Sequence, residues 1–137
     1  AFGGEPSGTW LHPDFCMCPD GLLSGLRIVK CVQDHGKLSE QLEAIESYPT
    51  IREKVTCPND KKESVMECVE SSFVDEFEDV DEILTIDGVR ISFTDGSWVL
   101  IRPSGTEPYV RITAEGKTQE HLNKIENISK NFLSKLI

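Results

Sequence analysis

Two Asp-Gly dipeptides, Asp87-Gly88 and Asp95-Gly96, constrain the fold of this chain more than any other feature. They separate three short apolar runs, which are Ile83 to Ile86, Val89 to Phe93 and Trp98 to Arg102. Asp-Gly between such runs is the strongest short-range signal for a β-hairpin, because both residues tolerate the positive φ of a tight turn. The second half of the chain is therefore predicted to form consecutive antiparallel strands.

The flanking segments complete the pattern. Apolar and polar residues alternate from Ile51 to Cys57, which predicts a half-buried strand, and Tyr109 to Ala114 forms a further run. Asn59 or Asp60 is expected to cap a helix with an apolar face made of Val65, Met66, Val69 and Phe73. A last helix is expected from about Thr118, with Leu122, Ile125, Ile128 and Phe132 facing inward. The order β-α-β-β-β-β-α predicts an α+β fold whose antiparallel sheet is covered by helices on one side.

The first part of the chain has a different pattern. Residues 2–9 are rich in glycine and are expected to form a loop. Asp20 can cap a helix to about Gln33, whose broad apolar stripe (Leu22, Leu23, Leu26, Ile28, Val29, Cys31, Val32) predicts burial on most sides. Ser39 can cap a short helix that ends before Tyr48-Pro49. We therefore expect one domain segment over 1–47 and a second domain over 48–137.

The charge is strongly acidic and unevenly distributed. The 137 residues carry 24 acidic and 14 basic side chains, and the net charge is −10. Such a balance argues against nucleic acid or an anionic membrane surface as a partner. Ten acidic residues between Asp60 and Glu82 face only Lys61 and Lys62, so this stretch holds −8 of the −10 and is expected to form a solvated helix face and loop. The remainder is nearly neutral and has room for a local positive site.

The cysteines and histidines give weaker signals. Five cysteines in a chain of this length favour a reduced, cytoplasmic setting over a disulfide framework. Cys16 and Cys18 could bind a metal, but no second pair has zinc-site spacing, so small unligated thiols are the simpler interpretation. His12, His35 and His121 are isolated in the sequence and are expected at the surface or at helix ends.

The segment Arg102-Pro103-Ser104-Gly105-Thr106-Glu107-Pro108 has the chemistry of a phosphate cradle. Ser104 and Thr106 offer hydroxyl donors, and Gly105 permits a tight turn in which backbone N–H groups converge on an anion. Arg102 and Arg111 flank the segment, and a guanidinium matches phosphate bidentately. On spacing alone, an ordinary connection between strands with solvated arginines remains an equal alternative.

A second candidate lies in Gly4-Glu5-Pro6-Ser7-Gly8. One residue separates Glu5 from Ser7, so an extended loop could point both side chains the same way. A carboxylate and a hydroxyl together can bind vicinal sugar hydroxyls. Taken alone, a glycine turn with incidental polar residues is the simpler interpretation.

Together, in this order, the two segments resemble the sugar-binding and phosphate-binding loops of the α-D-phosphohexomutase family. The R-P-S-G-T-E-P form is similar to that of the phosphoglucosamine mutase branch, including archaeal members. Asp20-Gly21 at a helix start and Trp98 before the phosphate loop fit as well, whereas Thr9 stands where the family often has histidine. The resemblance spans essentially the whole chain, and it implies a helical tail of an α/β third domain followed by a TBP-like fourth domain.

The resemblance implies a four-domain isomerase that moves a phosphoryl group between the 1- and 6-positions of a hexose, with glucosamine phosphate as the expected substrate. Glu5 and Ser7 would bind sugar hydroxyls; Arg102, Ser104, Gly105 and Thr106 would bind the non-reacting phosphate, with Arg111 in support. The phosphoserine motif and the aspartate loop for Mg²⁺ are absent from this sequence. The chain is therefore expected to be a C-terminal fragment that depends on upstream domains and a hexose bisphosphate activator, and to be inactive alone. A non-catalytic phosphosugar-binding module is the alternative, and a homodimer through the apolar helix is a further option.

Overall fold

The computed structural model describes residues 3–5 and 7–137, and the chain divides into two units, Ala1–Glu46 and Ser47–Ile137. Each unit contains a sheet of its own: three strands in the first unit and five in the second.

The sheet of the second unit is fully antiparallel, with the order β4-β8-β7-β6-β5. Its strands are β4 (Thr50–Thr56), β5 (Val80–Leu84), β6 (Val89–Phe93), β7 (Trp98–Pro103) and β8 (Tyr109–Glu115). Alternate residues of the three central strands are buried, which is the two-residue period of a sheet covered on one face.

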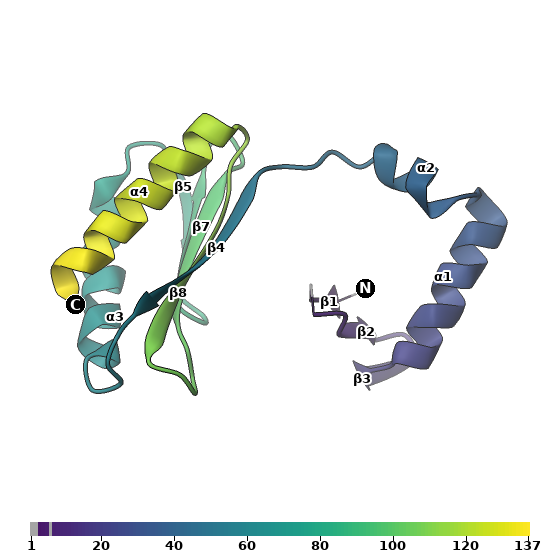
Figure 1. Ribbon diagram of the computed structural model, residues 1–137, viewed down its shortest axis with the longest axis horizontal. Helices are drawn as coiled ribbons and strands as arrows, with labels where there is room; N and C mark the ends of the chain where they lie inside the picture. The colour runs from purple at the N-terminus through teal and green to yellow at the C-terminus, as the bar shows by residue number, and fades with distance from the viewer. Residues whose placement is uncertain (1–2, 6) are drawn as a thin grey trace. The chain divides into compact units, whose positions relative to one another are not determined.

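Two helices, α3 (Lys62–Ser72) and α4 (Gln119–Leu136), cover one face of this sheet, and a 3₁₀ turn, η1 (Phe73–Glu76), follows α3 (Figure 1). Phe73, Leu122, Ile125 and Leu133 from these elements are almost completely buried against the inward-facing residues of the strands. The opposite face carries no helix of this unit. The predicted α+β fold and element order are confirmed, with η1 as an addition.

Several predicted boundaries were wrong. The first hairpin strand begins at Val80 rather than Ile83, because Val80 pairs with Phe93 across a bulge, and Ile86 lies beyond the strand and is 92% exposed. The end of the acidic stretch therefore lies in β5, an edge strand, and not in a helix or loop as predicted. Charged side chains on an edge strand discourage pairing with other chains. Helix α3 follows Lys61 and has no side-chain cap, so neither Asn59 nor Asp60 caps it. By contrast, α4 begins where the sequence predicted, and the Thr118 side chain caps it by accepting from the His121 N–H.

The first unit begins with a small antiparallel sheet in the order β1-β2-β3, formed by Gly3–Gly4, Trp10–His12 and Cys16–Pro19. The prediction of a loop over 2–9 was wrong for β1, which pairs with Leu11 and Trp10; Phe2 and Pro6 lie outside the described residues. These strands were missed because two to four residues are too few to show the alternation of apolar and polar side chains.

Helix α1 (Gly21–His35) has the predicted start, since the Asp20 carboxylate accepts from the Leu23 N–H, and it stops at Gly36 with φ +86°. Helix α2 (Leu38–Glu43) follows Lys37 instead of a Ser39 cap and ends before Tyr48. The broad burial predicted for α1 is not found within this unit, where Leu22 is 86% exposed and Leu26 is 68% exposed. An apolar face of this size calls for a covering partner.

Candidate phosphate-binding site

The loop predicted to cradle phosphate joins the end of β7 to the start of β8. Arg102 and Arg111 are direct partners in the register of these strands, so both side chains leave the sheet on the face that the helices do not cover. Arg102 is held by Asp87, with Nη1 and Oδ2 separated by 3.1 Å. Its Nε is buried without a hydrogen-bond partner. Gly88 lies directly behind Arg102, where an added Cβ would come within 2.8 Å of the Arg102 Cβ.

Hydrogen bonds close the loop into a defined turn. The Ser104 N–H donates to the Tyr109 carbonyl over 3.0 Å, and the Tyr109 N–H donates to the Glu107 carbonyl over 2.8 Å. The Ser104 hydroxyl oxygen accepts from the Glu107 N–H over 3.1 Å. Its own proton is consequently free to be donated elsewhere.

The tip of the loop presents donors without acceptors. In the described part of the chain, no hydrogen bond engages the N–H groups of Gly105 and Thr106 or the Thr106 hydroxyl. These consecutive free N–H groups and the neighbouring hydroxyls are donors of the kind that bind the oxygens of a phosphate, and Arg102 lies two residues before Ser104.

The backbone at Gly105 does not require glycine, contrary to the expectation from the motif. Its φ is not positive, and an added Cβ would meet nothing within 4 Å, so the backbone of this turn does not require glycine. A glycine that the fold does not need keeps the loop open to the close approach of another molecule.

Lys62, at the first turn of α3, anchors the loop from the side. Its Nζ donates to the carbonyls of Ser104 over 2.6 Å and Glu107 over 2.5 Å, across more than forty residues of sequence. These two hydrogen bonds turn the carbonyl oxygens of Ser104 and Glu107 toward the lysine. The Lys62 ammonium also adds a positive charge to the loop that carries the free N–H groups. Sequence reasoning missed this residue, although Lys61 and Lys62 were the only cations in the acidic stretch.

Glu5 and Ser7 lie together in the first unit. The turn that carries them is closed by the Glu5 N–H donating to the Thr9 carbonyl over 2.9 Å. The Ser7 hydroxyl is 3.1 Å from Glu5 Oε2 and 3.2 Å from Thr9 Oγ1. Both residues are exposed, so this carboxylate–hydroxyl pair is accessible to a ligand.

A concavity at the other end of the strands of the second unit has the wrong charge for phosphate. Its volume is about 210 Å³, and its acidic rim contains Glu76, Glu78 and Asp79. These carboxylates would repel an anion, so the loop after β7 is the better phosphate site.

Comparison with known proteins decides the family. The description "Phosphoglucomutase/phosphomannomutase, C-terminal domain" matches residues 53–128, and "alpha/beta/alpha domain III" of the same family matches residues 1–48. The chain belongs to the phosphoglucomutase/phosphomannomutase family. The C-terminal match contains the whole phosphate loop, and the domain III match contains Glu5 and Ser7.

Relatives agree with this assignment. The chain is 77% identical to a "Probable phosphoglucosamine mutase" of Methanosphaera stadtmanae, over 99% of this chain and 30% of that protein. It is 48% identical to a "Phosphoglucosamine mutase" of Methanocaldococcus jannaschii, over 90% of this chain and 27% of that protein. The chain thus spans about 30% of the length of such relatives. A phosphoglucomutase/phosphomannomutase family protein from Burkholderia thailandensis shares the fold, with a TM-score of 0.81 and 23% identity over 98% of this chain and 28% of its own length.

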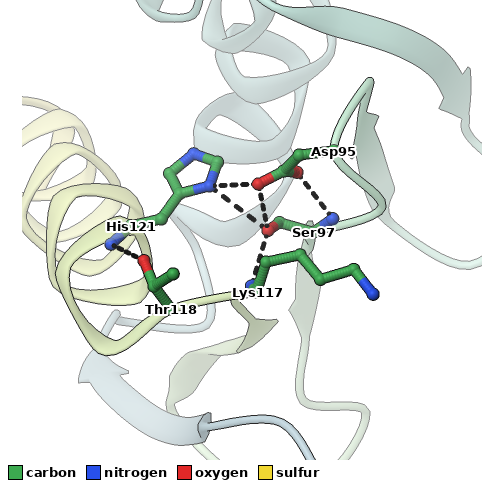
Figure 2. A network of polar contacts seen from close by, with 5 residues as sticks. All are labelled: Asp95, Ser97, Lys117, Thr118 and His121. Atoms are coloured by element: carbon green, nitrogen blue, oxygen red, sulfur yellow. Dashed lines mark hydrogen bonds and ion pairs between the residues drawn. The ribbon is translucent and has the colours of Figure 1, made fainter.

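A serine, a histidine and an aspartate of this family member meet at the start of α4, yet they do not form a nucleophilic triad (Figure 2). Both the Asp95 carboxylate (2.7 Å) and the Ser97 hydroxyl (3.2 Å) contact the same His121 nitrogen, Nδ1. The Ser97 hydroxyl donates to Asp95 over 2.9 Å and accepts from the Lys117 N–H over 2.9 Å. In a catalytic triad the histidine uses one ring nitrogen for the serine and the other for the aspartate, which is not the arrangement here. The role of this network is instead structural, because it joins the β6–β7 turn to α4.

The network also sets the charge of Asp95. Desolvation acts to raise its pKa, but hydrogen bonds from Ser97 and His121 outweigh it and hold the pKa of Asp95 below its ordinary value. His121 is half-buried near a helix start, as expected, whereas the expected surface position of His12 was wrong. His12 is 3% exposed and its Nε2 lies 2.8 Å from the Ser24 hydroxyl.

The described residues offer no metal centre. No group of three or more His, Cys, Asp and Glu side chains among residues 3–5 and 7–137 is arranged to hold an ion. Cys16 and Cys18 are free, with their sulfurs 3.0 Å apart, and the hydrogen bond from Cys18 lowers the pKa of Cys16. Over the same residues, every helix is too short or too polar to cross a membrane.

Proposed function

We propose that this chain is the C-terminal, substrate-binding part of a phosphosugar mutase that interconverts hexose 1- and 6-phosphates, with glucosamine phosphate as its substrate. Support comes from the two family domains that the chain matches and from the printed names of its archaeal relatives. In this proposal residues 1–47 end the third domain with the sugar loop, and residues 48–137 form the phosphate-binding domain.

The observation that carries the proposal is the set of unengaged donors at the loop tip. Gly105 and Thr106 would donate their N–H groups to the phosphate that is not reacting, and the hydroxyls of Ser104 and Thr106 would add two further hydrogen bonds. The Arg102 guanidinium, already oriented by Asp87, would bind the same phosphate, with Arg111 in support. Holding this phosphate fixes one end of the hexose, so that the other end is presented for reaction.

The sugar itself is proposed to contact Glu5 and Ser7. The carboxylate accepts from one sugar hydroxyl, and the Ser7 hydroxyl can donate to or accept from its neighbour. Two adjacent groups of this kind recognise a vicinal diol without reacting with it.

Phosphoryl transfer is proposed to occur in upstream domains of the parent protein, which would supply the phosphoserine and the ligands of Mg²⁺ and respond to a hexose bisphosphate activator. The residues described in this chain do not fit a magnesium site, so no step assigned to them involves the metal. They bind and orient the substrate. The setting proposed for the parent is the cytoplasm.

The test is a mutase assay on the full-length parent with Mg²⁺ and a bisphosphate activator, in parallel with the isolated chain. We expect the parent to convert glucosamine phosphate with a higher kcat/KM than glucose or mannose phosphates, and the isolated chain to show no turnover. A parent that binds phosphosugars but converts none would refute the mutase proposal in favour of a binding module. Turnover by the isolated chain, with contaminating enzyme excluded, would refute its purely substrate-binding role.

A further inference from the structure

Two cysteines of the first unit bring their sulfur atoms into contact on one short strand. Cys16 and Cys18 are alternate residues of β3, and their sulfurs are 3.0 Å apart, so both side chains turn to the same side of the strand. Both thiols are free; Cys16 is half-buried and Cys18 is exposed. The pair is therefore a dithiol that a small molecule can reach.

The pairing of β3 with β2 leaves this segment room to bend. Leu11 pairs with Pro19, and the next residue of β2, His12, pairs with Cys16. Two residues of β3, Cys18 among them, therefore lie between these pairs as a bulge. A bulge interrupts the ladder of hydrogen bonds and bends the strand, so Cys18 can move closer to Cys16 while β2 and β3 stay paired.

The contact between the thiols also prepares one of them as a nucleophile. The hydrogen bond from Cys18 lowers the pKa of Cys16, and the same contact raises the pKa of Cys18. Cys16 is thus the first of the two to ionise, while Cys18 keeps its proton. Because the thiolate is the reactive form of cysteine, Cys16 is the attacking sulfur of the pair.

The other three cysteines have different surroundings. Cys31 donates to the side-chain oxygen of Gln41 over 3.0 Å. Cys57 is completely buried, and burial raises the pKa of its thiol. Cys68 is exposed on α3, where it is the accessible thiol of the second unit. An accessible thiol without a second one beside it can form a mixed disulfide but cannot resolve it, so Cys68 provides an internal control.

We propose that Cys16 and Cys18 form a reversible thiol–disulfide exchange site that reacts with low-molecular-weight disulfides. The Cys16 thiolate attacks one sulfur of the reagent, which forms a mixed disulfide and releases one thiolate. Cys18 then loses its proton and attacks the Cys16 sulfur, which closes the Cys16–Cys18 disulfide and releases the second thiolate. The two protons that the pair gives up are taken by the released thiolates, so the reagent is reduced to two thiols as the pair is oxidised.

The pair lies on the same small sheet as the candidate sugar-binding segment. β3 pairs with β2, β2 pairs with β1, and the segment that carries Glu5 and Ser7 joins β1 to β2. Closure of the disulfide would fix the bulge of β3 one strand away from that segment. An exposed disulfide is readily reduced again, which is typical of a regulatory bond and not of a structural one.

The test is peptide mapping of the full-length parent after incubation with glutathione disulfide and acid quenching. Trypsin cleaves after Arg27, so Cys16 and Cys18 share one peptide, and Cys68 is the one cysteine of peptide 63–90. We expect the first peptide to lose two hydrogen atoms and to carry no glutathione. Dithiothreitol should restore its reduced mass. The Cys68 peptide should gain at most one glutathione and lose no hydrogen pair.

Serine variants separate the two steps of the exchange. Cys18→Ser should stop after the first step and retain one glutathione on Cys16. Cys16→Ser, which lacks the attacking thiolate, should react more slowly than Cys18→Ser and close no disulfide. Cys31→Ser is the matched control and should leave the loss of two hydrogen atoms from the pair unchanged.

The wild-type parent alone is sufficient to overturn this inference. A pair that stays reduced, or that retains glutathione without closing, would contradict it, whether or not Cys68 reacts. A disulfide that joins Cys16 or Cys18 to another cysteine would contradict it as well. The readout is a mass and not an activity, so failure of the exchange leaves the proposed function standing, and loss of the proposed function leaves the exchange site standing.

Discussion

Gly88→Ala should destabilise the second unit strongly, because two separate penalties meet at this turn. Gly88 has φ +94°, a conformation that costs alanine about 1–2 kcal/mol. The added Cβ would also lie 2.2 Å from the Ile101 carbonyl oxygen and 2.9 Å from the Arg102 Cα. Both are backbone atoms of a paired strand, so relief requires β7 to move by about 1 Å, at a cost of about 1–3 kcal/mol.

The matched control is Gly96→Ala at the other Asp-Gly turn. Gly96 has nearly the same φ, +87°, but the nearest atom to an added Cβ is Lys117 Cε at 3.4 Å, the far part of a flexible side chain. Gly96→Ala should therefore carry the φ penalty alone, about 1–2 kcal/mol. The difference between the variants isolates the contact with β7, which leads directly into the phosphate loop.

The assay is thermal and urea unfolding followed by circular dichroism. For a unit of this size each kcal/mol lowers Tm by about 4–8 °C, so Gly88→Ala, with a total penalty of about 2–5 kcal/mol, should melt roughly 8–40 °C below wild type and below Gly96→Ala. Equal losses of stability in the two variants would refute the argument from the Ile101 and Arg102 contacts. A Gly88→Ala protein as stable as wild type would refute both parts of it.

Further perturbations separate binding from folding. Lys62→Met should raise the Kd for phosphate at the loop about tenfold in an amide-shift titration, since two charge-assisted hydrogen bonds to loop carbonyls are lost, while Lys61→Met should stay within about twofold. Gly105→Ala should leave Tm within about 2 °C of wild type yet weaken phosphate binding; unchanged binding would show that the loop tip does not contact the anion. Asp95→Asn should reduce the free energy of unfolding near neutral pH by an amount that disappears on acidification. The folded pKa of Asp95 lies below its unfolded value of about 3.9, so its stabilisation is complete above that pH and lost as the pH falls through the folded pKa. A difference that does not shrink as the pH falls below about 3.9 would contradict this explanation.

The strands and the last helix could be predicted because local signals and burial agree there. In β6 and β8 every second residue is buried, so hydrophobic alternation and the sheet period coincide. Thr118 caps α4 through its own side chain, which is a purely local interaction. Both Asp-Gly turns have the glycine at positive φ that the dipeptide predicts.

Other features depend on contacts between distant residues and could not be read from the sequence. Val80 belongs to a strand because it pairs with Phe93. The charged residues that follow Val80 interrupt the run of apolar residues, so the sequence pattern does not show that the strand begins there. Helix α1 has the apolar face of a buried helix, but the elements needed to cover Leu22 and Leu26 are not found in its unit.

In the candidate site, too, local features could be predicted from the sequence, and contacts between distant residues could not. The motif located the loop, whereas the anchoring by Lys62 and the alignment of Arg102 with Arg111 arise only when separate strands and a helix meet. Gly105 was expected to be needed for a tight turn, and this expectation was wrong, since its φ is not positive and its backbone does not need glycine.

The most direct test of the central claim is the kinetics of Arg102→Ala in the full-length parent, measured in both reaction directions. If the loop binds the non-reacting phosphate, loss of a charge-assisted bidentate contact worth about 1.5–3 kcal/mol should lower kcat/KM about ten- to a hundredfold. Both directions should be affected, because the same loop must hold either phosphate of the hexose in turn. Arg102→Lys should recover only part of the loss, since it keeps the charge and loses the fork. Wild-type kcat/KM in both directions for Arg102→Ala would contradict the account and leave the loop a structural connection.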